Sequence, residues 1–214
     1  MNNKIKALLV DDHAVVRAGF KLLLSTSAEI EVVAEAERGE QAIQLYQDCQ
    51  SDIIVLDLSM PGIGGLETIR RLVQRDDQVS ILVFSVHHEQ VYVSRALSAG
   101  AKGYITKNSA PGILLEAIES IHQGQGYVEH GLLKATSSPD IEQNYQKVLQ
   151  TFSPREFDVF RLLAKGLTAH QISDELCIGY KTVANYVTQI KKKLQVSSMA
   201  ELAHVAVVLG IMKH

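Results

Sequence analysis

The sequence predicts an α/β domain built on a doubly wound, five-stranded parallel sheet, followed by a small all-α domain. Three observations predict this. Short apolar runs alternate with helix-length segments up to about residue 123, closely spaced helix caps follow residue 150, and the net charge changes sign between the two parts. Alternating strands and helices indicate βαβ units, in which helices cover both faces of a parallel sheet.

Length and charge support two domains with different partners. A chain of 214 residues is long enough for two domains of about 100 residues each. Residues 1–150 hold 13 Lys and Arg against 19 Asp and Glu, whereas residues 151–214 hold 8 against 5. No apolar run approaches the roughly 20 residues of a membrane span, and no secretion signal opens the chain. Cys49 and Cys177 lack disulfide or metal spacing, so we expect a cytoplasmic protein without membrane contact.

Five apolar runs are the expected strands of the first domain: Ala7–Val10, Ile30–Ala34, Ile53–Leu56, Ile81–Phe84 and Gly103–Thr106. Uninterrupted apolar runs of this length are typical of strands buried on both faces. An open parallel sheet places its working residues at the carboxyl ends of its strands, beside the point where the strand order reverses.

Polar residues stand at four of these strand ends. Asp11 and Asp12 follow the first strand, Asp57 the third, Ser85 the fourth and Lys107 the fifth. We expect these ends to converge on one crevice. Three neighbouring carboxylates repel one another unless a cation lies among them. Oxygen ligands with room for water favour Mg²⁺.

The same residues predict phosphoryl chemistry. Lys107 and Ser85 would bind the oxygens of a phosphoryl group, and Asp57 is the expected nucleophile because carboxylates form acyl phosphates. A single Asp at a strand end is more often a turn residue or a helix cap. The functional interpretation therefore depends on the combination of residues, not on any one of them.

Competing active sites match less well. A haloacid-dehalogenase-type phosphatase needs a second acid two residues after its nucleophile, where this chain has Ser59. The segment "MPGIGG" lacks the Lys-Ser/Thr of a P-loop and the spacing of a dinucleotide fingerprint. His87 and His88 have no ligand partners at useful spacing, and we expect them to be loop residues.

Residues 4–122 resemble a response-regulator receiver domain, through "LLVDDH", "VLDLSMPGIGGLE", "VFS" and "GAKGYITK". The resemblance implies a flavodoxin-like fold in which Asp57 accepts a phosphoryl group from a sensor histidine kinase. It also implies that Asp12, Asp57 and the backbone carbonyl of Ser59 bind Mg²⁺, with Asp11 assisting.

The resemblance assigns two further roles. Ser85 and Tyr104 would be a switch pair that turns inward on phosphorylation, and Lys107 would contact the phosphoryl group.

After this domain the pattern changes. Residues 124–150 are rich in Gly, Ser, Pro and polar residues and are expected to be a linker, with a helical turn near Ile141–Leu149. Residues 1–123 and 151–214 are the expected domains. In the second domain, "SPRE", "TAHQ" and "SMAE" read as capping boxes of three helices, and a further helix is expected over Tyr180–Leu194.

The helix over Tyr180–Leu194 has two different sides. One side carries the apolar stripe Val183, Val187, Ile190 and Leu194. The other side and its edges carry the candidate DNA contacts Lys181, Thr182, Asn185, Gln189, Lys191, Lys192 and Lys193. Lysines suit phosphates, whereas Asn and Gln can pair with adenine edges, so the two central helices indicate a helix-turn-helix.

Residues 152–210 resemble the LuxR-type helix-turn-helix of the NarL/FixJ response regulators, through "PRE", "LLAKGLT", "QIS", "KTV", "KKL" and "AEL". Gly179 departs from this pattern, since the family usually has Ser there. The resemblance implies a regulator, not an enzyme, that binds double-stranded DNA and forms a homodimer when phosphorylated or on DNA. Two rivals remain open. An interaction protein would lack salt-dependent DNA binding, and a phosphohydrolase would turn over aryl phosphates.

Overall fold

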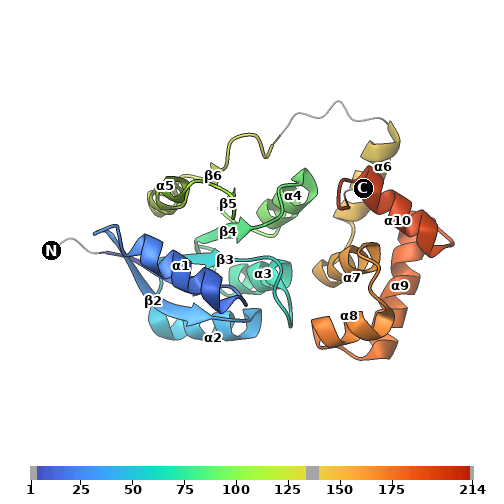
Figure 1. The fold of residues 1–214 in the computed structure, drawn as a ribbon, viewed down its shortest axis with the longest axis horizontal. Helices are drawn as coiled ribbons and strands as arrows, with labels where there is room; N and C mark the ends of the chain where they lie inside the picture. The colour runs from blue at the N-terminus through green and yellow to red at the C-terminus, as the bar shows by residue number, and fades with distance from the viewer. Residues whose placement is uncertain (1–3, 134–139, 213–214) are drawn as a thin grey trace. The chain divides into compact units, whose positions relative to one another are not determined.

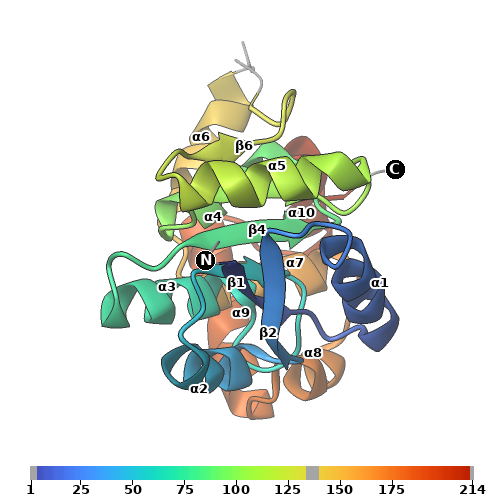
Figure 2. The ribbon, with the colours of Figure 1, turned by 90° about the vertical axis from the view of Figure 1, so that its left-hand side faces the viewer.

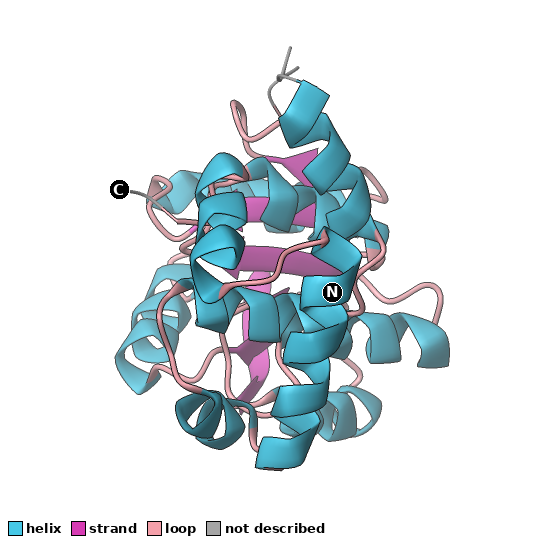
Figure 3. Ribbon diagram, turned by 90° about the vertical axis from the view of Figure 1, so that its right-hand side faces the viewer, coloured by secondary structure: helices cyan, strands magenta, loops and turns pink. Residues whose placement is uncertain are grey.

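The chain folds into two compact units, residues 1–133 and 134–214. A computed structural model describes residues 4–133 and 140–212 (Figure 1). Every strand in the described residues belongs to the first unit (magenta in Figure 3), and the described part of the second unit consists of helices and loops. The predicted division into an α/β part and an all-α part is confirmed. None of the described helices is long and apolar enough to cross a membrane.

The sheet of the first unit is entirely parallel and has six strands in the order β2-β1-β3-β4-β5-β6. The strands are β1 (Ile5–Val10), β2 (Ile30–Ala36), β3 (Ile53–Leu56), β4 (Ile81–Ser85), β5 (Gly103–Thr106) and β6 (Tyr127–Val128). All five predicted strands are present. The sequence does not predict β6, because a two-residue edge strand leaves no periodic pattern.

Helices cover both faces of this sheet: α1 (Ala14–Leu24), α2 (Gly39–Cys49), α3 (Gly65–Arg75), α4 (Gln90–Ser98) and α5 (Pro111–His122). Figure 2 shows α1 on one side of the sheet and α2 and α3 on the other. Leu9 and Val55 belong to a core cluster that includes Leu114 and Ile118 of α5. Leu8 on the other face is also fully buried. The strand order reverses between β1 and β3, so their carboxyl ends lie side by side.

The second unit contains α6 (Asp140–Gln150), α7 (Pro154–Ala164), α8 (Ala169–Leu176), α9 (Tyr180–Leu194) and α10 (Met199–Val208). Ser153 and Thr168 head complete capping boxes, and Ser198 accepts a bond from the backbone of Glu201. The predicted bounds of α9 match those observed. Its stripe is buried at Val183, Ile190 and Leu194. The stretch 124–150, expected to be a linker, contains β6 and α6, and its residues 134–139 lie outside the described chain.

Gly65 lets the start of α3 approach the end of β3 closely. A Cβ at Gly65 would lie 2.5 Å from the carbonyl oxygen of Asp57 and 2.5 Å from Leu58 Cα, and these backbone atoms cannot move aside. A Cβ at Gly112 in α5 meets nothing within 4 Å. The two glycines therefore provide a matched pair for substitution.

We expect Gly65→Ala to lower the free energy of unfolding of the first unit by roughly 1–3 kcal/mol, because the added methyl group overpacks the strand end. Gly112→Ala should raise it by about 0.5–1 kcal/mol, because alanine is the better helix former. Urea unfolding followed by circular dichroism measures both changes. Equal shifts of the two midpoints would contradict the close approach at Gly65.

Candidate functional site

Three of the predicted residues form a buried ionic cluster at the carboxyl ends of β1, β3 and β5. Asp11 and Asp57 are only 4% and 3% exposed. The Lys107 ammonium donates to Asp11 Oδ2 at 2.5 Å and to Asp57 Oδ2 at 2.9 Å. Burial acts to lower the pKa of Lys107, but the charges of Asp57 and Asp11 outweigh it and raise that pKa above its ordinary value. Lys107 is therefore a fixed cation between two carboxylates.

The cluster retains unsatisfied negative charge. Asp12 Oδ1 and Asp57 Oδ1 are buried oxygens that accept no hydrogen bond within the described chain. Ligand atoms of Asp11, Asp12, His13 and Asp57 all lie within 4.8 Å of one another. Three carboxylates and one ammonium group leave a formal charge of -2, which a divalent cation would neutralise. The oxygen ligands suit Mg²⁺, and receiver domains bind Mg²⁺ at such an acidic pocket.

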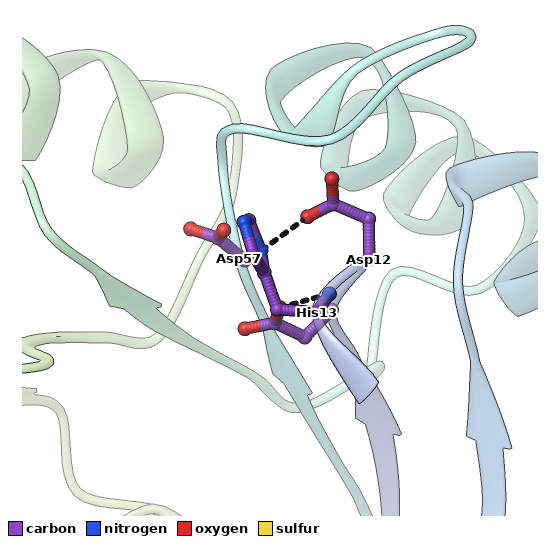
Figure 4. Close-up of side chains that lie close together, drawn as sticks. Asp12, His13 and Asp57 are labelled. Carbon is purple, nitrogen blue, oxygen red and sulfur yellow. Dashed lines mark hydrogen bonds and ion pairs between the residues drawn. The ribbon is translucent and has the colours of Figure 1, made fainter. Parts of the chain in front are cut away.

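His13 joins this cluster, although the sequence reasoning does not select it. Its Nδ1 lies 2.9 Å from Asp12 Oδ1 and 3.2 Å from Asp11 Oδ1. Figure 4 shows the His13 ring between the side chains of Asp12 and Asp57. The sequence indicates its place in the cluster only through its position directly after Asp11 and Asp12.

Arg17 of α1 binds the backbone of the acid pair Asp11 and Asp12. Its guanidinium donates to the Asp11 carbonyl oxygen at 2.6 Å and to Glu37 Oε1 at 2.8 Å. Glu35 lies 3.6 Å from Arg17 Nε and also binds Lys21 at 2.8 Å. Arg17 is 8% exposed, so a buried side chain fixes the backbone from which Asp11 and Asp12 project. In the sequence, the only sign of this role of Arg17 is a basic residue on the core-facing side of an amphipathic helix.

The predicted switch residues, Ser85 and Tyr104, are both fully buried. The Tyr104 hydroxyl donates to the carbonyl oxygen of His87 at 2.8 Å. His87 lies in a loop, as expected, but its ring is engaged. It stacks on Tyr92 with ring centroids 4.0 Å apart, and its Nε2 lies 3.0 Å from the Ser59 hydroxyl. His87 therefore connects the loop after β4 to the loop that carries Ser59.

Five of the seven candidate DNA contacts of α9 are exposed, and Lys191 and Lys193 are half-buried. Its exposed candidates are Lys181, Thr182, Asn185, Gln189 and Lys192. Thr188 is exposed as well, and the sequence reasoning omits it. The hydroxyl of Thr188 donates to the Ala184 carbonyl at 3.0 Å, which leaves its methyl group available for contact.

Two lysines of this helix have partners within the second unit. Lys193 Nζ donates to Glu156 Oε2 at 2.7 Å and to the Thr151 carbonyl at 3.0 Å. Although burial opposes it, the ammonium of Lys193 helps to lower the pKa of Glu156 below its ordinary value. Lys191 Nζ donates to the Ser197 carbonyl at 3.0 Å. Lys191 and Lys193 thus stabilise the fold around α9.

Two family descriptions match the chain. Residues 7–119 match the response regulator receiver domain, and residues 150–206 match the bacterial regulatory proteins of the luxR family. Among solved structures, a LuxR-family two-component response regulator from Aurantimonas sp. SI85-9A1 is 38% identical with a TM-score of 0.59, covering 61% of this chain and 93% of that one. RcsB of Salmonella typhimurium shares the fold with a TM-score of 0.71 at 23% identity, covering 96% and 98%.

Curated relatives match along nearly the whole length. The transcriptional activator protein ExaE of Pseudomonas putida is 42% identical over 208 residues, which cover 96% of this chain and 97% of the relative. The response regulator UvrY of Escherichia coli K12 is 35% identical over 208 residues, covering 97% and 95%. The chain therefore belongs to the NarL/FixJ response regulators, which join a receiver domain to a LuxR-type DNA-binding domain.

Proposed function

We propose that Asp57 is phosphorylated by a partner sensor histidine kinase and that phosphorylation controls sequence-specific DNA binding and transcription. The observation that supports this most directly is the contact between Asp57 and Lys107. The Asp57 carboxylate, which is 3% exposed, lies 2.9 Å from the fixed ammonium group of Lys107. Both stand at the carboxyl ends of parallel strands, where ligands bind in sheets of this kind.

In the proposed transfer, a carboxylate oxygen of Asp57 attacks the phosphorus of a phosphohistidine. The phosphorus–nitrogen bond breaks as the oxygen–phosphorus bond forms, and the kinase histidine leaves and takes up a proton. Lys107 would meet the phosphoryl oxygens with positive charge, and the Ser85 hydroxyl would donate to one of them. Mg²⁺, held by Asp12, Asp57 and the Ser59 carbonyl with Asp11 assisting, would supply further charge stabilisation.

For the second unit we propose that the exposed face of α9 lies in the major groove. Lys181 and Lys192 would contact phosphates, whereas Asn185, Gln189 and Thr182 would face base edges. Lys191 and Lys193, whose ammonium groups have partners in the fold, would contribute little. A helix-turn-helix reads paired half-sites most economically as a homodimer, so we propose dimerisation on DNA or on phosphorylation. Such a regulator meets its kinase and its DNA in the cytoplasm.

We expect a small acyl-phosphate donor with Mg²⁺ to add a single acid-stable, hydroxylamine-labile phosphoryl group to the chain. Asp57→Ala should abolish this labelling, and Asp12→Ala should weaken it because a metal ligand is lost. Radiolabelling or intact mass spectrometry measures the product, with exposed Asp77→Ala as the control. Full labelling of Asp57→Ala would contradict the assignment, and multiple turnover on aryl phosphates would favour a phosphohydrolase.

Lys193→Met should lower the free energy of unfolding of the second unit by roughly 1–3 kcal/mol, because the buried Glu156 carboxylate loses its cation. Lys192→Met should leave stability unchanged and reduce the log–log salt slope of DNA binding by about one unit. Urea unfolding and binding titrations at several salt concentrations measure the two effects. If Lys193→Met changed the salt slope without changing stability, Lys193 would be a phosphate contact after all.

Asn185→Ala should cost roughly 1–3 kcal/mol at the preferred DNA site and little on random DNA, because it removes paired hydrogen bonds to a base edge. Fluorescence anisotropy with specific and random duplexes measures both affinities, and Lys192→Met is the control that weakens both alike. A neutral Asn185→Ala together with altered site preference in Lys192→Met would require a different orientation of α9.

A further inference from the structure

His13 occupies a position where its side chain would ordinarily cap a helix. It is the N-cap residue of α1, yet its side chain makes no capping hydrogen bond. Ser, Thr, Asp and Asn are preferred at this position because their oxygens accept from the first helical turn. The His13 ring contacts the acid cluster instead. The ring therefore leaves the first turn of α1 without a side-chain cap and lies against the carboxylates.

The ring is not required as a hydrogen-bond donor to Asp11. Asp11 Oδ1 already accepts from the backbone N–H of His13 at 2.8 Å, and Lys107 binds Oδ2. Asp12 Oδ1 accepts no hydrogen bond, although His13 Nδ1 lies only 2.9 Å from it. Asp57 Oδ1 is likewise buried without a hydrogen-bond partner. His13 Nδ1 lies within hydrogen-bond distance of Asp11 Oδ1 at 3.2 Å, and the two unsatisfied oxygens belong to carboxylates of the same cluster, whose ligand atoms all lie within 4.8 Å of one another.

The spacing of these atoms suits one coordination sphere. Ligand atoms about 2.1 Å from a cation lie about 3 Å apart when they occupy neighbouring octahedral positions. His13 Nδ1 lies 2.9 Å from Asp12 Oδ1 and 3.2 Å from Asp11 Oδ1. The His13 side chain is 63% exposed, so the ring has room to turn its nitrogen toward a bound ion.

We propose that His13 is a nitrogen ligand of the divalent-cation site and makes it a mixed carboxylate–imidazole centre. This inference rests on the proposed metal site and specifies which ions it favours. Mg²⁺ prefers oxygen, so His13 adds little to its affinity. Co²⁺, Ni²⁺ and Zn²⁺ bind imidazole more strongly than Mg²⁺ does. The site would therefore bind these ions in preference to Mg²⁺.

Calorimetric titration of the full chain with Co²⁺ and, separately, with Mg²⁺ tests the selectivity. His13→Ala should weaken Co²⁺ binding at this site at least about tenfold, the scale of effects seen when a metal centre is perturbed. Mg²⁺ affinity should stay within about twofold. His122→Ala removes an exposed histidine from the last turn of α5 and should change neither affinity. Equal losses for both ions in His13→Ala would show that His13 acts only on the charge or shape of the site, and would overturn the proposal.

Proton NMR of the Co²⁺-loaded chain tests ligation directly. An imidazole bound to Co²⁺ should give a strongly shifted resonance from a carbon-bound ring proton, which does not exchange with water, and Asp12→Ala and His13→Ala should each remove it. Persistence of that resonance in His13→Ala, or its absence from the unsubstituted chain with Co²⁺ bound, would overturn the proposal. The Mg²⁺ titration and the resonance distinguish the role of His13 from the existence of the metal site. If Mg²⁺ binds in an Asp12-dependent way without the shifted resonance, only the role of His13 fails, and if Mg²⁺ does not bind, the metal site fails.

Discussion

The ammonium group of Lys107, shared between the carboxylates of Asp11 and Asp57, is the interaction on which the organisation of the site depends. It joins the ends of three strands that are not consecutive in sequence. One positive charge cannot neutralise two buried carboxylates together with Asp12 beside them. The remaining negative charge, together with the unsatisfied oxygens Asp12 Oδ1 and Asp57 Oδ1, makes the cluster able to accommodate a divalent cation.

The surrounding fold is adapted to keep these charges in place. Gly65 allows the backbone of α3 to lie against the carbonyl of Asp57, and Arg17 fixes the Asp11 carbonyl from the opposite side. Both contacts act on the backbone, so they position the carboxylates without consuming their oxygens. Asp12 Oδ1 and Asp57 Oδ1 accept no hydrogen bond within the described chain and can therefore bind a ligand.

Much of the fold and part of the site could be predicted from the sequence, for identifiable reasons. The strands follow from apolar runs, and the meeting of Asp11, Asp57 and Lys107 follows from the rule that parallel strands end at one edge. Contacts that depend on side-chain direction could not be predicted. His87 stacks on Tyr92 and Lys193 pairs with Glu156 because of tertiary packing, which neither spacing nor residue type reveals.

The geometry of the proposed switch has a mechanical consequence. Burial raises the pKa of Tyr104, so its phenol stays protonated and able to donate. It donates to the carbonyl of His87, while the backbone N–H of the same residue lies 3.4 Å from the Ser85 hydroxyl oxygen. A Ser85 hydroxyl drawn toward a phosphoryl group on Asp57 would give up that contact. Ser85 and Tyr104 both contact His87, so under the proposed function the loop between β4 and α4 is the element through which a change at Asp57 would be transmitted.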